Sequence, residues 1–165
     1  MDSLVHAYLF DGSGSGKKLE VKEIEDWNPE SGLIWLHFQY TDEAAKQWIL
    51  ESSGLSDVCA EALVTEETRP RCTIIDGGVL LALRGVNLNP GSDPEDMVSI
   101  RLYIDEMRII STRKRQLLSV TNLVTSIENG SGPLNAAEFI IRLTAGLTEI
   151  MQGTIDELEE RSALV

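Results

Sequence analysis

Carboxylates gather toward the C-terminal end of the 165-residue chain, and these side chains are the ones best suited to metal chemistry. The candidates that we predict to contact a metal ion are Asp156, Glu159 and Glu160, with Glu149 and Glu157 nearby. Isolated carboxylates bind divalent cations weakly, so a tight site would need several of them converging from neighbouring chains. The sequence therefore predicts a weakly cation-attracting surface, with an ordinary solvated helix face as the alternative for most of these residues.

Other potential metal ligands are scattered along the chain. His6 and His37 each lie in an apolar strand pattern, where a core or edge histidine is commoner than a ligand. Cys59 could join Glu61 and Glu66 in a zinc site, but the spacing is unspecific, and a small buried thiol is the better interpretation. We predict no metal site at these residues.

A glycine-rich segment at residues 11–18 has the composition of a phosphate-binding loop but not its spacing. If Gly16 and Lys17 were the Gly-Lys pair of that motif, the first glycine would fall on Asp11 and the hydroxyl residue on Lys18. A flexible hairpin loop is therefore predicted. The chain also has no nucleophile elbow and no Ser/His/Asp set, so we expect no enzymatic activity and no required cofactor.

Composition limits the partners of the chain. Its 14 basic and 27 acidic residues give a net charge of -13, which repels nucleic acids and anionic lipid headgroups. The hydrophobic fraction of 42% suffices for one globular domain with its own core. Two cysteines make no disulfide framework, and no stretch approaches the ~20 apolar residues that span a bilayer. The sequence thus predicts a soluble segment in a reducing compartment.

The elements that must position these side chains begin with an α/β pattern. Apolar or alternating runs predict a sheet of about seven strands, at residues 4–10, 19–24, 33–38, 72–75, 79–86, 97–104 and 107–112. Helices are predicted from a cap at Thr41 or Asp42 to about Ser52, from Ser56 to about Val64, and from Leu117 to Asn129.

A long helix is predicted from a capping box of Asn135 and Glu138 to the last residue. At ~1.5 Å per residue its ~31 residues would form a rod of ~46 Å, longer than the core of so small a domain requires. One face is apolar, at Ile140, Leu143, Leu147, Met151, Ile155 and Leu158. The pattern reaches Val165 without a stop, so we expect the natural protein to continue.

Four strings of the sequence are more specific than its periodicity: Thr68–Arg71 with the following Asp76–Gly78 turn, the long run Leu83–Leu102, Ile109–Arg115 and Gly153–Glu159. They resemble the CorA-type metal ion transporter family, and its zinc-transporting ZntB branch in particular. The similarity covers nearly the whole chain in order. The resemblance implies an α/β/α cytoplasmic domain around a mixed sheet, here residues 1–129, followed from residues 135–165 by the start of a long stalk helix that leads to absent membrane helices.

The same resemblance implies a bacterial inner-membrane transporter with Zn²⁺ as the transported ion, other divalent cations as possible ligands, and a homopentameric funnel. The fragment would lie on the cytoplasmic side and attract or regulate metal ions, and only the missing helices would contact the membrane. The alternative is a soluble metal-sensing or coiled-coil interaction module. A strict heptad would favour that alternative, but the spacing after Ile140 drifts toward eleven-residue repeats.

Overall fold

The computed structural model describes residues 4–66, 71–85, 91 and 97–163. In chain order the elements are β1 (Leu4–Phe10), β2 (Gly16–Lys18), α1 (Val21–Glu25), the 3₁₀ turn η1 (Pro29–Ser31), β3 (Ile34–Gln39), α2 (Glu43–Glu51), α3 (Asp57–Val64), β4 (Arg71–Ile75), β5 (Gly78–Gly85), β6 (Val98–Ile104), β7 (Arg108–Arg113), α4 (Leu118–Glu128) and α5 (Ala136–Ala163). The predicted α/β class is confirmed.

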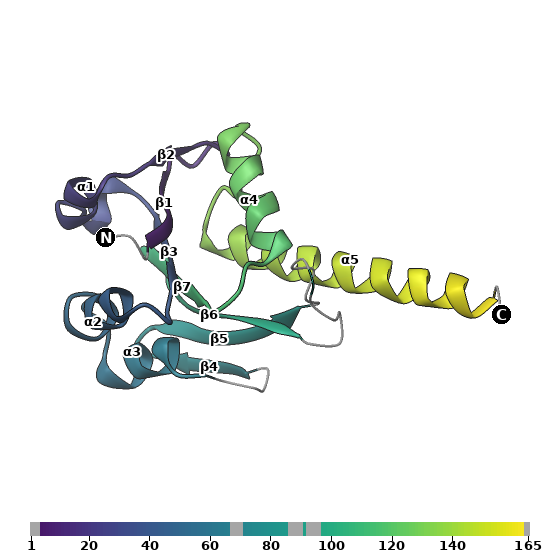
Figure 1. Ribbon diagram of the computed structural model, residues 1–165. Helices are drawn as coiled ribbons and strands as arrows, with labels where there is room; N and C mark the ends of the chain where they lie inside the picture. Colours follow the sequence, from purple (N-terminus) through teal and green to yellow (C-terminus); the bar gives the residue numbers. More distant parts are fainter. Residues whose placement is uncertain (1–3, 67–70, 86–90, 92–96, 164–165) are drawn as a thin grey trace.

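The seven strands within the described residues form one mixed sheet in the order β2-β1-β3-β7-β6-β5-β4. The central pair, β3 and β7, is parallel, with Trp35 opposite Ile109, and the other neighbouring strands are antiparallel. Parallel pairing requires a crossover connection. Here the connection runs through α2, α3 and three further strands. β3 and β7 therefore lie side by side in the sheet although they are far apart in the sequence (Figure 1).

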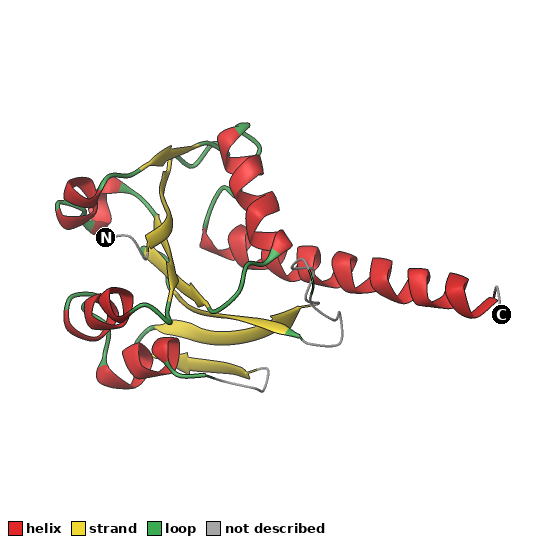
Figure 2. Cartoon of the chain, in the orientation of Figure 1, coloured by secondary structure: helices red, strands yellow, loops and turns green. Residues whose placement is uncertain are grey.

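Helices cover both faces of this sheet, as Figure 2 shows. On one face, α4 and α5 bury a core that includes Trp35, Leu102 and Phe139. On the other face, α2 and α3 bury a second core that includes Phe38, Ile49 and Leu63. Both cores depend on alternation along the strands, because successive side chains point to opposite faces of a sheet. The arrangement is the predicted α/β/α layering.

Local signals placed most helix starts correctly. The Asp42 carboxylate accepts the Ala44 backbone N–H at 2.9 Å, and the Ser56 hydroxyl accepts the Cys59 backbone N–H at 3.3 Å. Each side chain satisfies an amide that the first turn of a helix leaves without an intrahelical partner. The turn between β4 and β5 is also as predicted, since Asp76 and Gly77 both have positive φ, which two-residue hairpins favour.

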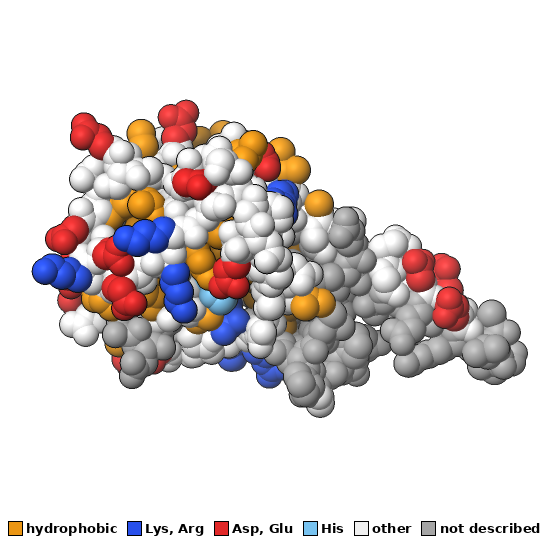
Figure 3. Space-filling model, turned by 90° about the horizontal axis from the view of Figure 1, so that it is seen from above, with side chains coloured by type: hydrophobic (Ala, Val, Ile, Leu, Met, Phe, Trp, Pro, Cys, Tyr) orange, Lys and Arg blue, Asp and Glu red, His pale blue; other side chains and the backbone are white. Residues whose placement is uncertain are grey.

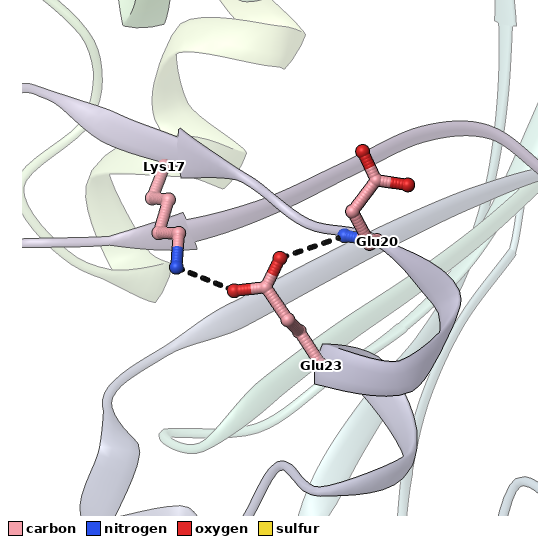
Figure 4. A network of polar contacts seen from close by, with 3 residues as sticks. All are labelled: Lys17, Glu20 and Glu23. Carbon is pink, nitrogen blue, oxygen red and sulfur yellow. Dashed lines mark hydrogen bonds and ion pairs between the residues drawn. The ribbon is translucent and has the colours of Figure 1, made fainter.

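The strand predicted at residues 19–24 is wrong. The second strand is instead β2, and Val21 begins the short helix α1. Figure 4 shows the polar contacts that fix this helix: Glu23 pairs with Lys17 of β2 and accepts the Glu20 backbone N–H at 3.1 Å. Alternation over so few residues also fits one helical turn. The Glu23 carboxylate, three residues after Glu20, caps the chain at this point and favours the helix over the strand.

Helix α5 runs without a break from Ala136 to Ala163, over 28 residues, and its second half extends away from the body (Figure 1). The described residues thus include a helix over most of the predicted range, and its role as a stalk stays a prediction. The last two residues of the predicted helix, and most of the loop predicted at residues 87–96, lie outside the described residues. So does most of the Thr68–Arg71 string.

Candidate metal-attracting surface

The site begins with the cap that starts α5. The side-chain oxygen of Asn135 accepts the Glu138 backbone N–H at 2.8 Å, which is one of the two bonds of the predicted capping box. Arg142, one turn further on, donates from Nη1 to the Ser131 carbonyl at 2.6 Å. These two bonds tie the first turns of α5 to the linker after α4 and so set its direction.

The first half of α5 is packed against the body. Phe139, Leu143 and Leu147 are buried at intervals of four residues, and the Phe139 ring meets the Trp35 ring edge-on at 5.0 Å. A Cβ at Gly85 would come within 2.7 Å of the Leu147 Cδ2 methyl group, which shows how closely α5 packs on the end of β5. The body therefore holds α5 as far as Leu147.

The apolar face predicted for α5 is covered only in part. Leu143 and Leu147 are buried and Ile140 is partly buried, whereas Ile155 retains 44% of its exposure. The side chains of Met151 and Leu158 lie outside the described set. The prediction missed Phe139, whose ring contacts both the Trp35 and the Phe10 rings.

The three predicted metal candidates lie on the part of α5 beyond the body. Asp156, Glu159 and Glu160 are all exposed, and Figure 3 shows acidic side chains on this projecting end. Their spacing of three and four residues puts them on one helix face, with neighbouring Cβ atoms ~5–6 Å apart. One Asp156 oxygen accepts a hydrogen bond from Gln152 at 2.9 Å, and none of the three pairs with a lysine or arginine among the described residues.

Such a face attracts cations without enclosing one. Like charges at these spacings repel, and a divalent ion near them relieves that repulsion. Ca²⁺-type and Zn²⁺-type sites need several converging ligands, which one face of one helix does not supply. Within the described part of the chain, no group of three His, Cys, Asp or Glu side chains is placed to hold a metal ion.

The histidines lie together, away from this surface. Their rings stack with centroids 5.8 Å apart, and His37 is fully buried with its Nδ1 2.6 Å from the Ser111 hydroxyl. The same hydroxyl accepts the Trp35 indole N–H at 2.9 Å. Burial lowers the pKa of His37 well below its ordinary value, and nearby Arg113 and His6 lower it further. His37 is thus a neutral core histidine, as its strand position indicated.

Cys59 is also a core residue. Its thiol is buried and lies 3.4 Å from a carboxylate oxygen of Asp76, and burial raises its pKa. A thiol held in the protonated form is a poor metal ligand. The two acidic residues considered with it do not join it: Glu61 is exposed, and Glu66 pairs with Lys114 at 3.8 Å.

The glycine-rich loop has a structural role that sequence reasoning missed. The Asp11 carboxylate accepts the Ser13 backbone N–H and hydroxyl, each at 2.8 Å, and these bonds lower the Asp11 pKa. The Gly14 carbonyl accepts the Gly132 N–H at 2.7 Å, and a Cβ on Gly14 would lie only 2.6 Å from the Gly130 carbonyl oxygen. The loop is therefore docked on the segment between α4 and α5.

Comparison with known proteins agrees with this architecture. The sequence model of the CorA-like Mg²⁺ transporter protein family matches residues 30–163. The divalent cation transporter CmaX of Pseudomonas aeruginosa is 39% identical over 171 residues, which cover 98% of this chain and 51% of that protein. The zinc transport protein ZntB of Pectobacterium carotovorum is 32% identical over 157 residues, covering 95% of this chain and 47% of that protein.

Among solved structures, the ZntB cytoplasmic domain of Vibrio parahaemolyticus has the same fold, with a TM-score of 0.81 at 23% identity. That match covers 97% of this chain and 64% of the Vibrio chain. The chain spans about half the length of the curated relatives it matches. No helix in its described ranges is long and apolar enough to cross a membrane. With the family match over residues 30–163, these findings show that the chain belongs to the CorA-like Mg²⁺ transporter family, a family of ion transporters rather than enzymes.

Proposed function

We propose that this chain is the cytoplasmic part of a divalent cation transporter of the bacterial inner membrane, with Zn²⁺ as the transported ion. The observation that carries the proposal is the acidic face of α5, exposed on an arm that leaves the body of a transporter-family domain. The zinc assignment is supported by the ZntB relative, and the broader divalent assignment by CmaX.

In this proposal the two parts of the chain have different roles. Residues 1–129 form the cytoplasmic α/β body, and residues 135–165 begin a stalk that connects it toward the membrane part. About a third of the Vibrio ZntB cytoplasmic domain lies outside the match, so body and long helix do not account for the whole of that domain. We therefore propose only that α5 leads from the body toward the membrane part, and not that α5 itself continues directly into a membrane helix.

Assembly into a homo-oligomer, a pentamer by family resemblance, follows from the uncovered part of α5. The helix exposes apolar side chains such as Ile155 and Ile141, which neighbouring copies would cover. The same assembly would bring Asp156, Glu159 and Glu160 from several chains toward a common axis. Carboxylates that bind weakly alone would then act together on a passing divalent ion.

The experiment is a chimera in which this chain replaces the matching half of CmaX. Reconstituted in vesicles, it should move Zn²⁺ faster than protein-free vesicles do, with Mg²⁺ as the competing ion. A chimera that assembles and carries Mg²⁺ but not Zn²⁺ would contradict the zinc assignment. One that assembles and carries neither ion would contradict the proposed function as a whole.

A further inference from the structure

A pocket of about 430 Å³ is lined by residues in or next to α1, β3, α2 and β7. Helices α1 and α2 lie on the opposite side of the molecule from the projecting end of α5 (Figure 1). The floor of the pocket is apolar and comes from the first residues of the two parallel strands: Ile34, Leu36 and Ile110. Trp27, after α1, and Trp48, on α2, both line it. Pockets of this volume and composition are typical of small-molecule sites.

Contacts outside the pocket hold both indole rings. The Trp27 indole N–H donates to the Gly32 carbonyl at 2.9 Å. The Trp48 ring stacks on Phe38 with a centroid distance of 5.1 Å and an interplanar angle of 29°. Because these partners fix the rings, the side chains that line the pocket are already ordered before a ligand binds. Binding of an aromatic ligand would therefore cost these side chains little conformational entropy.

One cation also lines this pocket. Arg108 is partly buried and donates from Nη1 to the Ser53 carbonyl at 2.5 Å, while its guanidinium lies 5.7 Å from the centre of the Tyr103 ring. It forms no ion pair with a carboxylate within the described ranges. A fixed guanidinium beside an apolar floor suits a carboxylate attached to a flat apolar body. Among the described residues that line the pocket, Glu25 is the acidic one, and its charge disfavours ligands with several negative charges.

We propose that this pocket binds a small aromatic acid: a flat ring system packed between the Trp27 and Trp48 sides, with a single carboxylate on Arg108. The site is separate from the metal-attracting surface and does not depend on the proposed transport function. Its two tryptophans should report ligand binding directly through their fluorescence.

The test uses the 165-residue chain with 2-naphthoate as the probe and the neutral 2-naphthamide as its uncharged match. We expect one naphthoate per chain, with a dissociation constant below about 1 mM and quenched tryptophan emission. Naphthamide should bind about tenfold more weakly, since it lacks the charge-assisted bond. Arg108→Met should remove this preference for the acid while leaving naphthamide binding unchanged.

Two further variants separate the pocket from general surface effects. Ser52→Trp, at the exposed C-cap of α2, should fill the pocket and abolish binding of both probes although Arg108 is still present. Lys46→Met removes a cation from the same helix outside the pocket and should change neither affinity. The proposal is overturned if both probes bind equally well, if the folded Ser52→Trp chain still binds them, or if calorimetry detects no naphthoate binding.

Discussion

Replacing His37 should flatten the pH dependence of stability near neutrality. In the folded chain this imidazole is fully buried and its Nδ1 faces only the Ser111 hydroxyl, while the nearby charges are those of Arg113 and, when protonated, His6. Burial disfavours the imidazolium most, and the charges of Arg113 and His6 add to this effect, so the folded-state pKa lies well below the ordinary 6.5. The unfolded chain, in contrast, binds this proton with an ordinary pKa.

The sign follows from which state binds the proton more tightly. The contribution of a neutral buried His37 is fully present above about pH 6.5 and is lost as the pH falls through that value, because the unfolded state then takes up the proton. Between about pH 7.5 and pH 5.5 a single such histidine costs about 1.4 kcal/mol of unfolding free energy. The lowered pKa values of Asp11 and Glu23 act only below this window, since these carboxylates are ionised throughout it.

Urea unfolding of the wild type and of His37→Gln at these two pH values measures the effect. We expect the stability loss on acidification to be about 1.4 kcal/mol smaller in the variant, whatever its absolute stability. His6→Gln serves as the comparison, and because His6 is only half-buried its effect should be smaller. Equal losses in the wild type and in His37→Gln would refute the reasoning, because folded His37 would then bind its proton as readily as the unfolded chain does.

Three other predictions test separate parts of the account. Gly14→Ala should destabilise the fold by about 2 kcal/mol or more in urea unfolding, because Gly14 has a φ of 105° and its added Cβ would meet the Gly130 carbonyl. Gly12→Ala is the control: Gly12 also has a positive φ but open space around it, so this variant measures the cost of the backbone conformation alone. Sedimentation should show weak, concentration-dependent self-association that salt or Zn²⁺ promotes by screening the charge of -13, and a strict monomer under all conditions would contradict it. Calorimetry with ATP and NAD should show no micromolar binding, since the glycine loop lacks phosphate-loop spacing.

Much of the fold could be predicted because its signals are local. The caps at Asp42 and Ser56 and the Asp76–Gly77 turn each depend on a side chain and a backbone group only a few residues apart. The strand order could not be found in this way. The parallel pairing of β3 with β7 joins residues more than seventy positions apart, and the mixed sheet was anticipated from family resemblance alone.

The two candidate sites also differ in whether their residues are close together in the sequence. Asp156, Glu159 and Glu160 were predicted from one helical segment, and the structure shows them exposed on it, while their role in metal binding stays a prediction. The tryptophan pocket gave no local signal, because Trp27, Trp48 and Arg108 come from three distant parts of the chain. The strand predicted at residues 19–24 failed for a different reason: a single turn of helix and a short alternating strand share the same pattern.

The most direct test of the account is the Zn²⁺ dependence of flux through the CmaX chimera after neutralisation of the α5 surface. For Asp156→Asn/Glu159→Gln/Glu160→Gln, we expect the half-saturating Zn²⁺ concentration to rise roughly threefold at low ionic strength, with the maximal rate unchanged and the difference fading in high salt. The control, Glu51→Gln/Glu61→Gln/Glu106→Gln, removes the same charge from exposed positions on the body and should have little effect. Equal half-saturating concentrations in the two triple variants would contradict the claim that the projecting helix attracts the transported ion.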